Sequence, residues 1–144
     1  MREKTLDLLG LMRRANAIQI GETNAGAAVR GGKAKLLLLA SDASENARRR
    51  AEGFLHGRSA IGLTLPFTKE EISSHVGVGG CSMAAVTDIG FANALMKSLA
   101  TLAPEEYSAA AEEVERRFFK AERRKKEAKA RERNKRIGKR RTNI

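Results

Sequence analysis

The chain of 144 residues contains few of the residues that several classes of protein require. Cys81 is its only cysteine, which excludes an intrachain disulfide and a zinc site built from cysteines. His56 and His75 each stand alone in the sequence, so we interpret both as structural or surface residues and expect no metal and no cofactor. No apolar run approaches the roughly 20 residues of a membrane-spanning helix, and Asp7 and Arg13 interrupt the apolar stretch at the N-terminus. We therefore predict no signal peptide and no membrane partner, and we expect a cytoplasmic protein.

Motifs of nucleotide-binding and catalytic sites are also scarce. The glycines of the 77–80 segment do not have the spacing of a dinucleotide-binding loop, and no Gly-Lys-Ser/Thr sequence occurs. The same glycines match the G-x-x-G of KH domains, but a strand is predicted after them where a KH domain needs a helix. Asp42 and Asp88 are the carboxylates that come nearest to a catalytic pair, yet each lies where a strand leads into a helix. We interpret both as helix caps and do not expect an enzyme.

Positive charge is abundant and unevenly distributed. The formal net charge is +11. Residues 120–144 hold 13 Lys and Arg against 3 Glu, whereas residues 1–119 hold 15 Lys and Arg against 14 Asp and Glu. The basic tail therefore indicates a polyanionic partner. By charge alone this partner is RNA, DNA or an anionic membrane face, and of these a membrane is not expected.

Short apolar segments alternate with helical patterns over the first two thirds of the chain. Helices are expected near residues 6–15, 22–30, 44–54, 69–76 and 90–102, and strands at 18–20, 36–39, 61–65 and 83–86. Leu36–Leu39 offers apolar side chains to both faces, as a strand covered on both sides does. We predict one domain over residues 1–103, an α/β sandwich with a sheet between two helical layers.

Residues 104–144 are predicted to form a separate basic helical extension. Pro104 suits the first turn of a helix, and an apolar stripe runs from Tyr107 to Phe119. Beyond that point each acid stands four residues before a base, which supports helix by about 0.2–0.5 kcal/mol per pair. We expect the tail to fray and to order fully on a polyanion.

The most informative segment starts at Gly21, where a short strand passes into a helix. The first backbone amides of a helix have no intrahelical partner, and Thr23 and Asn24 add short polar side chains at this end. Such a helix start can bind an anionic group or the edge of a base. The alternative interpretation is an ordinary helix between two strands.

Four segments in the same order resemble the kink-turn-binding ribosomal protein family, here called the L-seven-Ae/L-thirty-e family. They are Leu8–Ala15 (LLGLMRRA), Ile20–Asn46, Pro66–Ile72 (PFTKEEI) and Ala85–Ala92 (AVTDIGFA). The resemblance covers about residues 5–100, and it is strongest to the bacterial YlxQ-like branch. The resemblance implies a mixed four-stranded sheet between helices and binding to structured RNA, with ribosomal RNA as the leading candidate. It does not account for residues 104–144, because members of this branch usually end near the last core helix.

The resemblance also implies an RNA-binding surface at the start of the 22–30 helix. In the family, a Gly-x-Asn-Glu-type motif and a Lys three residues later contact sheared G·A pairs and the RNA backbone at a sharp bend. Gly21 is kept, Glu22 occupies the variable position, and Thr23, Asn24 and Ala27 occupy the Asn, Glu and Lys positions. Ala27 cannot make the basic contact, so weaker RNA binding is expected with little effect on sequence choice.

The second family surface is the loop before the last strand, here residues 77–82. Val78 can supply an apolar contact to a flipped-out nucleotide, and Gly79 and Gly80 allow the RNA backbone to approach. The alternative interpretation is a flexible glycine turn.

The sequence is consistent with two functions. The first is a ribosome-associated or structured-RNA-binding monomer, with other ribosomal proteins as possible neighbours, that recognises a bent duplex with the helix after Gly21. Its tail would bind phosphates through Arg123, Arg124, Lys125, Lys126, Arg140 and Arg141. The second is a protein–protein assembly module with a decayed RNA site and a tail that binds polyanions without specificity. Ile20 and Ala27 favour this alternative, because they occupy positions that are often basic in the resembled family.

Overall fold

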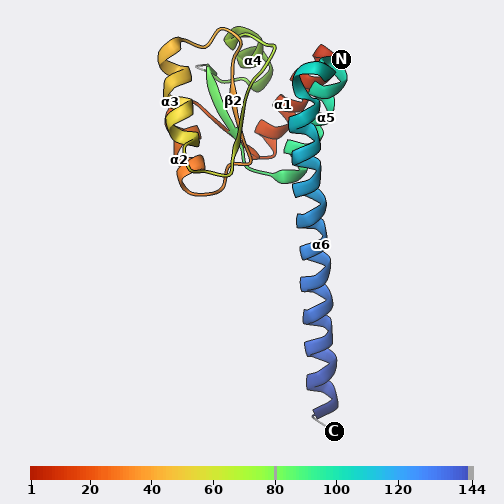
Figure 1. The fold of residues 1–144 in the computed structure, drawn as a ribbon. Coiled ribbons are helices and arrows are strands. Elements are labelled where there is room, and N and C mark those ends of the chain that lie inside the picture. The colour runs from red at the N-terminus through yellow and green to blue at the C-terminus, as the bar shows by residue number, and fades with distance from the viewer. Residues whose placement is uncertain (80, 143–144) are drawn as a thin grey trace.

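A computed structural model describes residues 1–79 and 81–142, with side chains as far as Ile137. Six helices and four strands alternate along this part of the chain (Figure 1). They are α1 (Arg2–Arg14), β1 (Ile18–Ile20), α2 (Glu22–Arg30), β2 (Leu36–Leu39), α3 (Glu45–Leu55), β3 (Ile61–Thr64), α4 (Lys69–Val76), β4 (Met83–Val86), α5 (Ile89–Leu102) and α6 (Pro104–Thr142). The predicted α/β class and C-terminal helical extension are confirmed.

The four strands form one mixed sheet in the order β1-β4-β2-β3. β4 pairs antiparallel with β1 and with β2, and β2 pairs parallel with β3. Successive side chains of a strand point to opposite faces, and all of β4 and the first three residues of β2 are buried. Leu36 and Leu38 join one apolar cluster, and Leu37 joins the other.

Two helical layers cover the sheet. α2 and α3 pack over the smaller cluster, and α1, α4 and α5 pack over the larger one. Figure 1 shows α2 and α3 on one side of β2, with α1 and α5 on the other. The predicted three-layer sandwich is therefore confirmed.

Short polar side chains mark three helix starts. Ser44 accepts a hydrogen bond from the Ala47 amide at α3, and Asp88 accepts one from the Phe91 amide at α5, so Asp88 is a helix cap as predicted. Asp42 instead accepts from the Lys69 amide at 2.9 Å. It therefore holds the first turn of α4 rather than the helix that follows it in sequence, because the end of β2 lies beside the start of α4.

The first part of α6 is packed on the core. Tyr107 and Val114 are buried in the larger cluster, and the Tyr107 hydroxyl donates to the Thr64 carbonyl. Burial raises the pKa of Tyr107 to about 12. The predicted boundary between residues 103 and 104 falls at the turn between α5 and α6, and the first turns of α6 contribute to the same core as α1 and α5.

The second part of α6 leaves the core. Every described side chain from Arg123 to Ile137 is exposed, and the helix runs well past the sheet (Figure 1). It continues to Thr142 as one helix, and its fraying in the absence of a polyanion stays a prediction. Ala, Glu, Lys and Arg dominate this segment and are strong helix formers. No helix among the described residues combines the length and apolarity needed to cross a membrane.

Two of the three tail acids have a basic partner among the described residues, and one of the predicted pairs is present. Glu132 lies 3.0 Å from the Arg136 guanidinium, as the spacing predicted. Glu122 lies 3.8 Å from Lys125 instead of reaching Lys126. Exposed pairs of this kind contribute at most about 1 kcal/mol each.

Candidate nucleic-acid interface

Gly21 makes the turn from β1 into α2. Its φ of +96° lies in the region that only glycine adopts without strain. Its amide donates to the Met83 carbonyl at 2.9 Å, and its own carbonyl accepts from the Ala25 amide at 2.8 Å. Gly21 thus makes the last hydrogen bond between β1 and β4 and accepts the first hydrogen bond of α2.

The start of α2 offers backbone donors that have no acceptor among the described residues. Gly21 has no side chain, so no side-chain cap bonds the first amides of the helix. Thr23, Asn24 and Ala27 are exposed together on one side, while Ala25 and Val29 are buried on the other. This combination of free amides and short polar side chains can bind an anion or a base edge.

Two polar side chains at this end are already engaged. The Arg50 guanidinium lies 2.8 Å from both carboxylate oxygens of Glu22, which compensates the negative charge beside the α2 face. The Asn24 amide nitrogen donates to the Ile20 carbonyl at 2.9 Å. The Asn24 oxygen remains as an acceptor on the exposed face.

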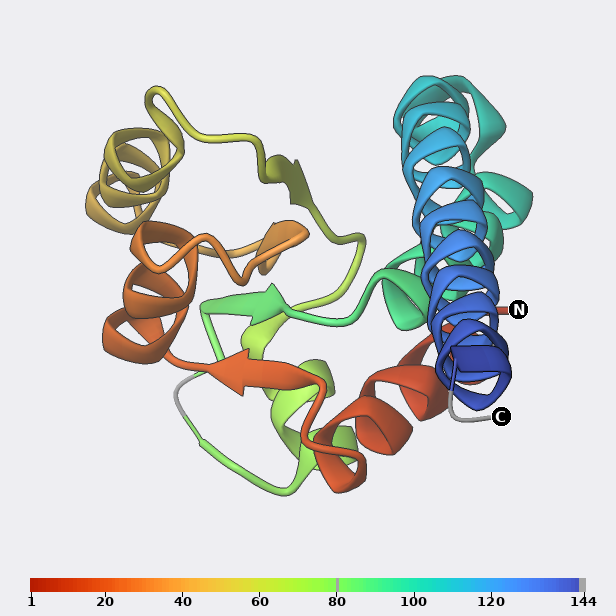
Figure 2. The same cartoon turned by 90° about the horizontal axis from the view of Figure 1, so that it is seen from below.

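The loop before β4 meets the start of α2. Gly77 ends α4 with a φ of +75°, and the Cys81 thiol donates to the Val78 carbonyl at 2.9 Å. Val78 is half-buried against the larger cluster, and Gly79 is exposed; Gly80 lies outside the described residues. Because Met83 is hydrogen-bonded to Gly21, the end of this loop lies beside the first turn of α2 (Figure 2). The two surfaces predicted separately therefore lie at one end of the sheet.

A groove of about 400 Å³ runs along α2. We call it the α2 groove; it is lined by Gln19, Asn24, Ala27, Ala28, Gly31, Lys33 and Thr87. Lys33 is exposed and places a cation in the same groove as Ala27. Lys33 was not among the residues predicted from the sequence, although the Gly-Gly-Lys-Ala-Lys run after α2 is a visible basic signal.

The predicted tail contacts lie on α6, apart from the α2 face. Arg123, Arg124, Lys125 and Lys126 are all exposed, and Arg124 lines a groove between α6 and the core. The side chains of Arg140 and Arg141 lie outside the described residues. Figure 2 shows α6 on the opposite side of the sheet from α2, so the described part of the tail does not reach the α2 surface.

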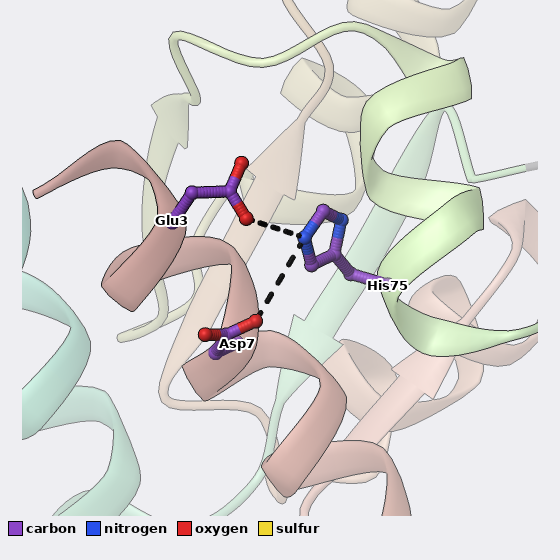
Figure 3. Close-up of side chains that lie close together, drawn as sticks. All are labelled: Glu3, Asp7 and His75. Atoms are coloured by element: carbon purple, nitrogen blue, oxygen red, sulfur yellow. Dashed lines mark hydrogen bonds and ion pairs between the residues drawn. The ribbon is translucent and has the colours of Figure 1, made fainter.

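His75 is not isolated, in contrast to its position in the sequence. Its Nε2 atom lies 3.2 Å from a Glu3 oxygen and 3.8 Å from an Asp7 oxygen (Figure 3). Hydrogen bonds to the Glu71 carbonyl and to Glu3 raise the pKa of His75, and the charges of Glu3 and Asp7 add to the effect. The three side chains could ligate a metal, but both carboxylates are exposed and the raised pKa favours an imidazolium ion pair that joins α1 to α4.

Comparison with known proteins identifies the fold and not a family. No family model matches the chain, and no curated protein matches its sequence. A solved structure of a protein of unknown function from Bacillus halodurans C has 26% identity and a TM-score of 0.59, over 64% of this chain and 92% of that one. The Giardia lamblia 15.5kD RNA binding protein has 18% identity and a TM-score of 0.52, over 64% of this chain and 78% of that one. The chain thus shares its fold with a protein that binds RNA.

Proposed function

We propose that this protein binds structured RNA and that its core recognises a kink-turn-like bent duplex. The α2 face and the 77–82 loop would contact the bend, and the basic part of α6 would bind phosphates. The protein would act as a monomer in the cytoplasm, on or near the ribosome, without catalysis. Asp42 and Asp88 support the last point, because both carboxylates already accept helix amides.

One observation carries the proposal: the hydrogen bond from the Gly21 amide to the Met83 carbonyl. It places the free amides of α2 beside the glycine-rich loop, so one RNA bend could contact both. The Giardia lamblia neighbour supports it, since its fold is shared and it binds RNA. The resemblance to the L-seven-Ae/L-thirty-e family and its YlxQ-like branch supports the finer claim of kink-turn recognition and ribosome association.

The second candidate is an assembly module whose tail binds polyanions without specificity. Ala27 favours it, because it exposes a methyl group where the resembled family has a lysine. Phe119 also favours it, since 53% of this large apolar residue is exposed on α6. The two candidates differ in what the core binds on its own.

The deciding experiment is a titration of a kink-turn RNA and an equal-length plain duplex. The full chain is compared with residues 1–119, which keep the buried Tyr107 and Val114 of α6. We expect the shortened chain to prefer the kink-turn and the full chain to bind both RNAs more tightly. If the shortened chain binds neither RNA and the full chain binds both alike, the assembly module is correct.

A further inference from the structure

A second groove lies where α6 passes the edge of the core. It has a volume of about 400 Å³. We call it the α6 groove; it is lined by Gly32, Ala34, Lys35, Ser59, Ile89, Arg117, Lys120, Ala121 and Arg124. The four α6 residues follow the spacing of one helix face. The other five come from the loop after α2, the segment before β3 and the start of α5, so only the tertiary fold assembles this groove.

The lining of the α6 groove is basic. Four of its residues carry a positive charge, and none is acidic. Arg117 is engaged, because its guanidinium donates to the Ser59 carbonyl at 2.7 Å and to Glu113 at 2.9 Å. It joins α6 to the segment before β3.

The other three cations have no partner within the described part of the chain. Lys35, Lys120 and Arg124 take part in none of its ion pairs or side-chain hydrogen bonds. Like charges gathered around one depression repel one another and raise the local concentration of anions. The groove therefore has the charge and shape to bind an anion.

One short loop joins the α6 groove to the α2 groove. Gly31 and Lys33 line the α2 groove, and the neighbouring Gly32, Ala34 and Lys35 line the α6 groove. Gly32 has a φ of +72° and no side chain, which lets a polymer backbone cross the loop closely. A nucleic-acid strand that lies along α2 can therefore continue past Lys33 and Lys35 onto α6.

We propose that the α6 groove binds backbone phosphates of the RNA strand that leaves the α2 surface, and so connects the core site to the basic tail. This inference rests on the proposed function and adds Lys35 and Lys120 as contact residues. Ammonium and guanidinium groups that bind phosphate oxygens position a nucleic acid without reading its sequence. The groove would thus determine the path of the RNA. The α2 surface would determine which RNA is bound.

The test compares two double variants of the full chain. Lys35→Gln/Lys120→Gln removes two charges from the groove, and Lys4→Gln/Lys69→Gln removes two exposed charges of α1 and α4 that line neither groove. Binding of the kink-turn RNA is measured over a series of salt concentrations. Each lost phosphate contact reduces the magnitude of the slope of log K against log salt by about 1. We therefore expect this magnitude to fall by about 2 in the first variant and to stay unchanged in the control.

The outcomes separate the two proposals. If the wild-type chain binds RNA and both variants keep its slope, the α6 groove is wrong while the proposed function stands. If the wild-type chain binds neither RNA, both proposals fail. Circular dichroism must show that every variant is folded at the temperature of the assay. The charge-preserving Lys35→Arg/Lys120→Arg must then keep the wild-type slope, and its failure to do so overturns the groove.

A second measurement places the RNA directly. Cys81 is buried, so a thiol-reactive photo-crosslinker can be attached at an introduced cysteine on the surface. We expect Ala121→Cys, inside the groove, to crosslink to the RNA and Ala109→Cys, exposed earlier on α6, not to do so. Equal crosslinking at the two positions would overturn the proposal.

Discussion

Two helical glycines permit close packing between neighbouring helices. A Cβ atom on Gly10 would lie 2.7 Å from the His75 carbonyl oxygen, and one on Gly26 would lie 2.7 Å from the Phe54 ring. The first neighbour is backbone and cannot rotate away, whereas the second belongs to a side chain. Gly10 therefore determines how closely α1 approaches α4.

We predict opposite effects of alanine at two helical glycines. Gly10→Ala should destabilise the protein by about 1–3 kcal/mol, because α1 and α4 must separate. Gly53→Ala should stabilise it by about 0.4–1 kcal/mol, since nothing lies near its Cβ and the unfolded chain loses freedom. Urea denaturation measures both, and a neutral Gly10→Ala would contradict the described packing of α1 on α4.

His75 gives the α1–α4 contact a dependence on pH. Glu3 and Asp7 face it from α1, and the Glu71 carbonyl and the Ser74 hydroxyl face it on α4. Its pKa is raised in the folded state, so the folded state binds the proton more tightly than the unfolded state does. The resulting stability is fully present below the unfolded pKa of about 6.5 and is lost as the pH rises through the higher folded pKa.

We predict that the wild-type chain loses its advantage over His75→Gln between about pH 5.5 and pH 8, the range that brackets the unfolded pKa of His. The difference in unfolding free energy should fall by up to about 1 kcal/mol, as expected for a largely exposed ion pair. Denaturation at several pH values measures it. His56→Gln is the control, since the side chain of His56 is exposed and makes none of the described contacts. A constant difference would exclude the ion pair.

At the scale of single elements, the exposed face of α2 is polar but carries little charge. It holds Thr23, Asn24 and Ala27, and the cation that lines the same groove is Lys33 on the following loop. If RNA contacts this helix as proposed, most of the phosphate attraction must come from other segments.

We predict that Ala27→Lys tightens binding to a kink-turn RNA. The added ammonium should make one phosphate contact and increase the slope of log K against log salt by about 1. Ala109→Lys adds the same charge to an exposed position of α6 outside both grooves and serves as the control. Equal affinities for the two variants would mean that RNA does not reach α2.

At the scale of the whole molecule, charge and fold are separated. Residues 1–119 carry nearly balanced charges, and residues 120–144 carry a large excess of Lys and Arg. α6 joins the two parts: its first turns are packed on α5 through Tyr107 and Val114, and its later turns project from the core (Figure 1). The α6 groove lies at the junction.

We predict that deletion of residues 120–144 flattens the salt dependence of RNA binding. If five or six tail residues contact phosphates, the slope should fall by about 4–5. Deletion of residues 138–144, which contain three bases, should cause a proportionally smaller change. An unchanged slope in the larger deletion would show that the tail does not contact RNA phosphates.

The sequence was sufficient to predict the elements and their layers. Apolar periodicity identified every helix and strand within a few residues, because local hydrogen bonding and burial set those patterns. The apolar run Leu36–Leu39 predicted a sheet covered on both faces. The start of α2 at Gly21 was also predictable, since the need for a positive φ is local.

The remaining features depend on contacts between distant segments. Asp42 accepts a hydrogen bond from the first amide of α4, His75 pairs with α1, and the glycine-rich loop lies beside Gly21. None of these follows from spacing, because strand order and helix packing decide which segments lie together. The sequence by itself determined the fold class, the basic tail and the face of α2. Only the tertiary structure brought Lys35 to Lys120 across the α6 groove, because residues far apart in the chain become neighbours only when α6 packs against α5.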